Sequence, residues 1–132
     1  MSSLNITNLS KSFGPKQALR DVTLNVTDGE FVVLLGPTAA GKTTTLRCVA
    51  GLEKIDSGQI MLGNQDVSRL SPAERDVALV FQSYALYPRK SAYQNLAFPL
   101  QARGMNRANI DARVKQVASL LRITELLNRR PA

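Results

Sequence analysis

Cysteine, aromatic side chains and long apolar runs are all scarce in this sequence of 132 residues. The single cysteine, Cys48, excludes an internal disulfide, and its place in a helix-like segment favours a small buried residue over a reactive thiol. Aromatic residues make up only 5% of the chain, which leaves few platforms on which unpaired bases can stack. No apolar run reaches the roughly 18 residues of a membrane span. We therefore expect any association with a membrane to be peripheral.

The composition is otherwise that of a globular protein, with 44% hydrophobic residues and enough length for a real core. The first residues contain no basic region followed by a long apolar core, so we expect a cytoplasmic protein. The formal net charge is +7, and the segment from Gln101 onward holds seven basic residues against two acidic ones. Most of these lie on the polar faces of helix-like segments, where a solvated surface is the usual explanation. We expect no nucleic-acid partner.

One short motif dominates what the sequence does contain. The run Gly-Pro-Thr-Ala-Ala-Gly-Lys-Thr-Thr matches the phosphate-binding loop G-x-x-x-x-G-K-[ST], between an apolar run and a helix-like segment. Such a loop points backbone N–H groups inward, and the following helix N-terminus adds partial positive charge. Lys42 is placed to reach the β- and γ-phosphates, and the Thr43 hydroxyl to bind Mg²⁺. The candidate nucleotide-binding residues of the loop are Gly36, Pro37, Thr38, Ala39, Ala40, Gly41, Lys42, Thr43 and Thr44.

Alternation and helical spacing predict the secondary structure around this loop. The apolar runs at 31–35 and 76–81 predict two strands that are buried on both faces. Ser91 is expected to cap a helix that Pro99 strains or ends, and Ile110, Val114, Val117 and Leu121 to share one helix face. The remaining predicted elements are strands at 4–9, 18–26 and 59–62, helices at 44–50 and 92–98, and a helical turn at 71–74.

Several runs together resemble the N-terminal half of an ABC transporter ATPase, of the type found in bacterial importers of maltose and glycerol phosphate. Beside the phosphate loop they include Ala-Gly-Leu-Glu, Ser-Gly-Gln-Ile, Val-Phe-Gln-Ser-Tyr-Ala-Leu-Tyr-Pro and Asn-Leu-Ala-Phe-Pro-Leu, in the family's order. The resemblance covers essentially the whole chain. It implies an α/β fold: a P-loop NTPase core with an antiparallel β-subdomain over about 1–87, and the beginning of a helical subdomain over about 88–132.

The same resemblance implies roles for residues outside the loop. Phe13 stands where the family stacks an aromatic ring on adenine, and Gln82 where a glutamine contacts Mg²⁺ and senses the γ-phosphate. Lys42 and Gln82 are thus the candidate catalytic residues, and Thr43 and Gln82 the candidate metal ligands. The segment from Tyr84 to Pro88 resembles the surface on which membrane-spanning permease subunits dock. The implied protein binds ATP and Mg²⁺, forms an ATPase homodimer, and lies peripherally on the inner face of the plasma membrane.

Three departures from the family pattern bear on these roles. Ala39 replaces a usual glycine, which strains the loop by about 1 kcal/mol if that position needs a positive φ. Arg89, Lys90 and Ser91 add two charges to the proposed docking face. The sequence has no Leu-Ser-Gly-Gly-Gln signature, no acidic strand end for Mg²⁺ and no histidine to serve as the family's switch residue. We therefore expect no stand-alone turnover by this chain.

The residues leave two alternatives to the importer ATPase. The first is a nucleotide-binding remnant or interaction module that does not hydrolyse ATP, which the missing catalytic motifs favour. The second is a nucleic-acid binder that uses the basic C-terminal segments, which predicts steeply salt-dependent binding. Because unpartnered apolar faces favour association, we also expect the chain to be marginally stable or to aggregate.

Overall fold

The computed structural model describes residues 2–131, and the chain divides into two compact units, one up to Leu79 and one from Val80 onward. Each unit has its own small hydrophobic core. The boundary near residue 87 that the sequence suggests stays a prediction. No helix in the described part of the chain is long and apolar enough to cross a bilayer.

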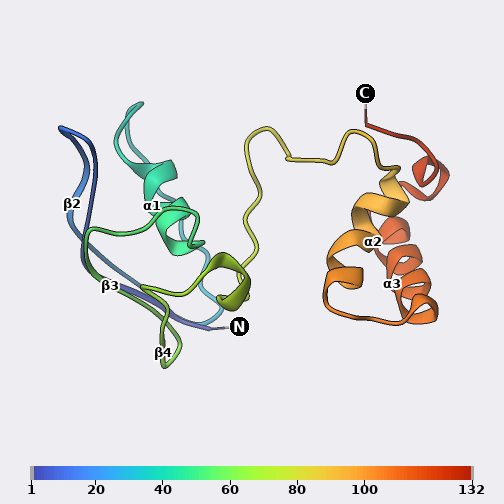
Figure 1. Ribbon diagram of the computed structural model, residues 1–132, viewed down its shortest axis with the longest axis horizontal. Helices are drawn as coiled ribbons and strands as arrows, with labels where there is room; N and C mark the ends of the chain where they lie inside the picture. The colour runs from blue at the N-terminus through green and yellow to red at the C-terminus, as the bar shows by residue number, and fades with distance from the viewer. Residues whose placement is uncertain (1, 132) are drawn as a thin grey trace. The chain divides into compact units, whose positions relative to one another are not determined.

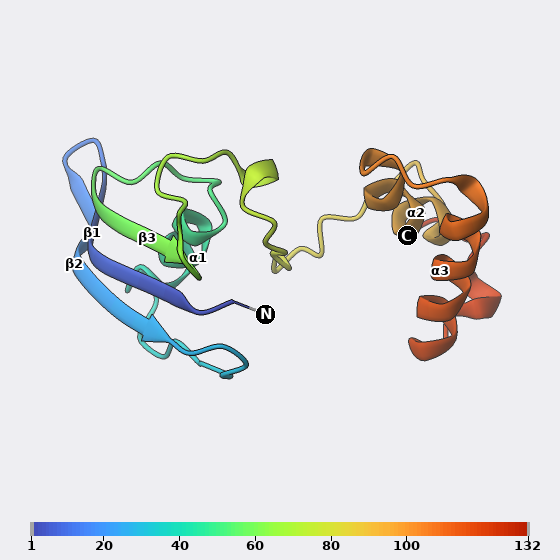
Figure 2. The same cartoon turned by 90° about the horizontal axis from the view of Figure 1, so that it is seen from below.

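A four-stranded antiparallel sheet in the order β2–β1–β3–β4 forms the base of the first unit (Figures 1 and 2). Its longest strands, β1 (Leu4–Phe13) and β2 (Lys16–Val26), make a hairpin. Gly14 lies in its two-residue turn with φ +57°, a conformation that glycine adopts without steric strain. The shorter strands are β3 (Ser57–Leu62) and β4 (Gln65–Asp66). The alternation predicted for the first two strands is thus confirmed, and both extend beyond the predicted bounds.

Helix α1 (Lys42–Val49) covers one face of this sheet. Its Cys48 side chain is fully buried, and burial raises the pKa of the thiol above its usual value. The sequence-based interpretation of Cys48 as a small core residue is therefore confirmed. The core that it joins combines β1, β2, β3 and the loop after β4, through Ile6, Leu9, Leu19, Ile60 and Val67.

The two strands predicted at 31–35 and 76–81 do not form, and this part of the sequence prediction is wrong. Both segments lack regular structure, and Phe31, Leu35 and Val80 are 90%, 87% and 83% exposed. A central strand needs hydrogen-bonding neighbours on both sides, and residues 2–131 supply these segments with none. Apolar composition alone therefore does not create a strand here.

Two helices, α2 (Ala92–Ala102) and α3 (Arg107–Leu120), make up most of the second unit. Ser91 caps α2 as predicted, because its side chain accepts a hydrogen bond from the backbone N–H of Gln94. Pro99 does not end the helix, which continues to Ala102, and the Arg103 N–H still bonds to the Pro99 carbonyl. Proline removes its own N–H donor and crowds the carbonyl four residues before it, so the predicted strain at this turn stays a prediction.

The two helices pack through the face that the spacing of apolar residues predicts. Ile110 and Val114 are buried and contact Ala97 of α2. Leu121 at the end of the same stripe is 56% exposed, so the predicted face is only partly covered. A short 3₁₀ turn, η2 (Thr124–Leu126), follows, and its neighbour Leu127 packs on this cluster.

Candidate nucleotide-binding site

The glycine that precedes α1 determines how the phosphate loop enters the helix. Gly41 is the N-cap of α1, with φ +86°. A Cβ atom at this position would lie 2.6 Å from Leu19 Cδ2 and 2.8 Å from the Ala18 carbonyl oxygen, both on β2. Any side chain would therefore push the loop away from the sheet. The second motif glycine is needed for close approach to β2 as well as for its backbone conformation.

Ala39 lies in the left-handed region, with φ +66°. This is the position at which the resembling family usually has glycine. Here an alanine adopts the conformation and accepts a strain of about 1–2 kcal/mol, because its Cβ crowds the following carbonyl. The loop thus keeps the glycine-type backbone at this position despite the substitution.

Lys42, the first residue of α1, folds back over the loop. Its Nζ donates to the Gly36 carbonyl at 2.8 Å and to the Pro37 carbonyl at 2.7 Å. The first turn of α1 contains no acidic residue, so no side-chain carboxylate neutralises the partial positive charge at this end of the helix. Thr43 is exposed at the same end. The Lys42 ammonium, the Thr43 hydroxyl and the backbone N–H groups of the first helical turn thus lie together at this end of α1. N–H groups at the start of a helix have no earlier helical carbonyl to bond to.

A cavity of about 220 Å³ joins this end of α1 to the β1–β2 hairpin. It brings Phe13, at the end of β1, together with the phosphate loop, as the sequence predicts; the ring is about half exposed. Gly36, Pro37 and Thr38 do not line it, although Gly36 and Pro37 contact Lys42. The lining residues are Phe13, Lys16, Ala18, Ala39, Ala40, Gly41, Lys42, Thr43 and Thr44.

Lys16 is a lining residue that the sequence analysis missed. It faces Phe13 across the hairpin in the β1–β2 register, so the cavity is lined by a second cation in addition to Lys42. The signal available in the sequence was a basic residue three positions after the candidate aromatic residue. The donors around the cavity are N–H groups, ammonium groups and hydroxyls, a set that fits a polyphosphate.

Gln82 belongs to the second unit, where it lies exposed in a turn at 82–85. Tyr84 and Ala85 in that turn have φ +59° and +49°. The following backbone is held by Asn95 of α2, whose side chain accepts from the Tyr87 N–H at 2.8 Å and donates to the Lys90 carbonyl at 3.1 Å. The contact between Gln82 and Mg²⁺ stays a prediction.

Arg75 is a second residue that sequence reasoning overlooked. It is only 6% exposed, and its guanidinium donates to the Cys48 and Val49 carbonyls at 2.6 and 3.0 Å, at the C-terminal end of α1. It also donates to the Leu70 carbonyl at 3.0 Å, in the loop that leads to the 3₁₀ turn η1 (Pro72–Glu74). Arg75 therefore fixes the end of α1 that lies opposite the phosphate loop. Nothing in its local sequence indicates this long-range contact.

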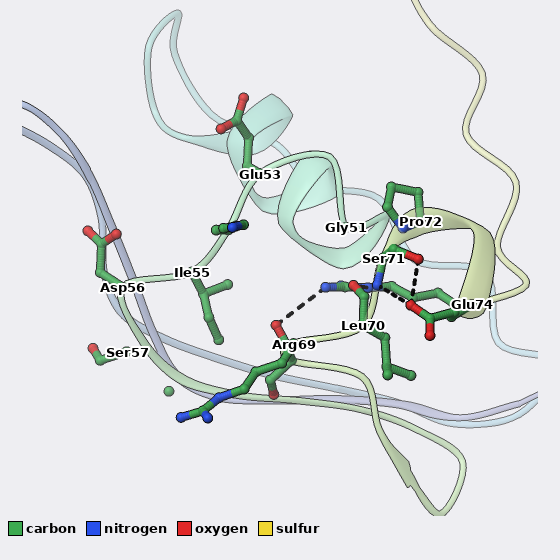
Figure 3. A pocket seen from close by; sticks show the side chains of 14 residues that line it. Gly51, Glu53, Ile55, Asp56, Ser57, Arg69, Leu70, Ser71, Pro72 and Glu74 are labelled. Atoms are coloured by element: carbon green, nitrogen blue, oxygen red, sulfur yellow. Dashed lines mark hydrogen bonds between the residues drawn. The ribbon is translucent and has the colours of Figure 1, made fainter.

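A larger cavity, of about 670 Å³, lies at this opposite end of α1 (Figure 3). The figure shows Ser71 and Glu74 hydrogen-bonded to each other at the start of η1, with Asp56 on the other side of the hollow. Its charged lining residues are evenly divided between the two signs, which does not favour a polyphosphate. These residues are Glu53, Asp56 and Glu74 against Lys54, Arg69 and Arg75.

Among solved structures, the chain is similar to an ATP-binding cassette captured as a dimer after hydrolysis, with ADP and phosphate bound. The TM-score is 0.85 at 27% identity, over 97% of this chain and 61% of that one. This similarity, with the antiparallel sheet and the helical unit, confirms the predicted fold class: part of an ABC ATPase domain with a P-loop NTPase core.

Curated relatives agree with this likeness. The chain is 50% identical to the trehalose/maltose import ATP-binding protein of Thermococcus litoralis, over 99% of this chain and 37% of the relative. It is 47% identical to an sn-glycerol-3-phosphate import ATP-binding protein of Rhizobium etli, over 99% of this chain and 38% of the relative. The chain thus spans a little over a third of the length of these relatives. The sequence pattern of the family "ABC transporter" matches residues 19–132, and the chain belongs to that family.

Proposed function

We propose that this chain is the nucleotide-binding portion of the ATP-binding subunit of an ABC importer, for sugars or related solutes. The observation that carries the proposal is the cavity in which Phe13 and the phosphate loop from Ala39 to Thr44 line one space. The flat ring suits the base of ATP, and the anion donors suit its phosphates.

Different site residues bind different parts of the nucleotide. The N-terminus of α1 and its loop hold the phosphates, while Lys42 exchanges the carbonyls of Gly36 and Pro37 for the β- and γ-phosphate oxygens. Phe13 stacks on the base, a contact worth about 1 kcal/mol. Lys42 and Gln82 act as catalytic residues in the whole protein, by stabilising and sensing the γ-phosphate.

Magnesium would be held by the Thr43 hydroxyl and phosphate oxygens, and the resemblance to the family implies Gln82 as a further ligand. No group of three or more His, Cys, Asp or Glu side chains among the described residues forms a metal site by itself. This donor set fits Mg²⁺, which keeps several waters and is commonly bound through substrate phosphates. When bound, the ion neutralises charge on the phosphates.

The transport role is inferred from the relatives, which are import ATP-binding proteins. In the whole protein, ATP binding closes a homodimer and hydrolysis reopens it, which drives the permease subunits on the inner face of the plasma membrane. The permease docks on the segment from Tyr84 to Pro88. Exposure of Tyr84 (77%) and Leu86 (54%) supports an apolar contact surface there.

Titration calorimetry of the chain with Mg·ATP tests the proposal directly. We expect saturable binding to the wild type and no measurable binding to Lys42→Ala, because the loop loses its only lysine. Lys54→Ala, an exposed lysine outside the cavity, is the matched control and is expected to bind like the wild type. Binding that is unchanged by Lys42→Ala, or absent from the wild type, would contradict a nucleotide site at this loop.

Phosphate release separates the importer ATPase from the alternative of a non-hydrolysing module. The absence of histidine and of the signature motif from this sequence favours no turnover by the chain alone. The matched measurement is turnover by the whole protein with and without Lys42→Ala. Turnover that needs Lys42 supports the ATPase, whereas nucleotide binding without any turnover supports the module.

A further inference from the structure

A cation covers part of the aromatic ring that borders the nucleotide cavity. Lys11 Nζ lies 5.2 Å from the centroid of the Phe13 ring, within the range of cation–π attraction. The two residues are two positions apart on β1, on either side of a shift in the β1–β2 register between Lys11 and Ser12. Both therefore belong to the strand, and the contact does not involve a loop residue.

Asp56 holds this lysine in place. Lys11 Nζ lies 3.3 Å from Asp56 Oδ1, and the other carboxylate oxygen accepts from the Ser12 N–H at 2.6 Å. The Asp56 N–H in turn donates to the Ser10 carbonyl. The Ser12 hydrogen bond, more than the neighbouring Lys11, keeps the pKa of Asp56 below its usual value, so the carboxylate stays ionised. The Lys11 side chain is consequently only 13% exposed.

Lys11 approaches the Phe13 ring from outside the nucleotide cavity. Phe13 lines the nucleotide cavity beside Lys16 and the phosphate loop, whereas Lys11 does not line it. The same ring thus lies within reach of the ammonium and borders the cavity. An ammonium near the ring attracts its π-electrons, which makes the ring a better partner for an electron-rich base.

We propose that Lys11, held by Asp56, is a positioning and specificity-determining residue for the nucleotide base. It holds the Phe13 ring beside the cavity and polarises it in favour of a purine over a pyrimidine. Lys11 acts on the base through Phe13 and does not contact the phosphates. The inference rests on the proposed function, because it requires a nucleotide in this cavity.

Two ligands distinguish an effect of Lys11 on binding of the base from an effect of its charge on binding of the phosphates. Calorimetric titration with Mg·ATP and with inorganic tripolyphosphate, which has no base, is carried out on the wild type and Lys11→Met. We expect Lys11→Met to bind ATP about two- to five-fold more weakly and tripolyphosphate as tightly as the wild type. The preference for ATP over CTP falls in the same variant. Lys11→Arg keeps a cation at the ring and restores both.

Lys115→Met, which removes the same charge from an exposed site on α3, is the matched control and should leave ATP affinity unchanged. Asp56→Asn is the second variant, because it frees the lysine without removing it, and should weaken ATP binding in the same direction. Circular dichroism establishes that each variant folds. Equal losses for ATP and tripolyphosphate, or no loss for ATP, overturn the role of Lys11. Failure of the wild type to bind either ligand overturns the proposed function itself.

Discussion

The side chains around the phosphate loop show how narrow the steric tolerance of this site is. Gly41 has no room for a Cβ atom against Leu19 and Ala18, whereas position 39 carries an alanine Cβ at φ +66°. The loop therefore needs glycine at position 41 for space, whereas glycine at position 39 would relieve only backbone strain. These two positions predict different responses to substitution.

Replacing Ala39 by glycine is expected to stabilise the chain slightly. The change relieves about 1–2 kcal/mol of left-handed strain, against about 0.4–1 kcal/mol of added entropy in the unfolded chain. The expected gain in the free energy of unfolding is about 0.5 kcal/mol, with tighter binding of Mg·ATP. Denaturant titration and calorimetry measure the two effects.

The neighbouring Ala40 provides the control for this experiment. Its φ is not positive, so Ala40→Gly relieves no strain and should lower the free energy of unfolding by about 0.4–1 kcal/mol. If the two glycine substitutions lower stability equally, the strain assigned to Ala39 is refuted.

Among the elements, helix α1 makes different contacts at its two ends. Its N-terminus carries the phosphate loop, and its C-terminal carbonyls at Cys48 and Val49 accept from the Arg75 guanidinium. A cation at a helix C-terminus is also favoured by the helix dipole. Gly51, with φ +77°, makes room for this arginine, since a Cβ there would lie 2.6 Å from its Nε.

Removing the Arg75 guanidinium is expected to destabilise the first unit strongly. Arg75→Met removes the hydrogen bonds to the carbonyls of Cys48, Val49 and Leu70, and the Cys48 carbonyl keeps the one from the Gly51 N–H. The loss of the Arg75 donors should lower the free energy of unfolding by about 2–4 kcal/mol. Arg75→Lys keeps the charge but loses the planar fork, and about half of that loss is expected. Thermal and denaturant unfolding measure both.

Arg69→Met is the matched control for the arginine series, because Arg69 is exposed. Its effect on the free energy of unfolding should stay within about 0.5 kcal/mol. A similarly small effect of Arg75→Met would show that the buried hydrogen bonds do not hold α1.

Across the whole chain, the most unusual property is the exposure of apolar segments that contain no regular structure. Residues 31–35 are all large and apolar, and Phe31 and Leu35 are almost fully exposed. Val80 and Tyr84 add to the exposed apolar surface of the second unit. Apolar backbone without strand neighbours can pair with a strand of another chain, and exposed apolar side chains favour that association.

We expect the isolated chain to self-associate, and the segment at 31–35 to contribute to it. Sedimentation velocity at increasing concentration should show species larger than the 14.4 kDa monomer. Leu35→Ser should reduce this association, whereas Leu120→Ser, at an exposed site on α3, should change it less. A single monomeric species at every concentration would contradict this expectation.

The sequence by itself determined the features that local chemistry decides. The phosphate loop followed from the spacing of two glycines and Lys42, strands β1 and β2 from alternation, and the start of α2 from its Ser91 cap. Each of these depends on residues a few positions apart, so a short window of sequence contains the whole cause. The fold class and the family came from the same motifs taken in order.

Only the tertiary structure decided which distant groups meet. It placed Phe13 beside the phosphate loop, connected Arg75 to Cys48 across 27 positions, and left residues 31–35 and 76–81 without strand partners. Apolar composition predicted those two strands wrongly, because a strand is stabilised by hydrogen bonds to neighbours far away in the sequence. A local pattern records the preference of a segment, but pairing depends on what the rest of the folded chain offers it.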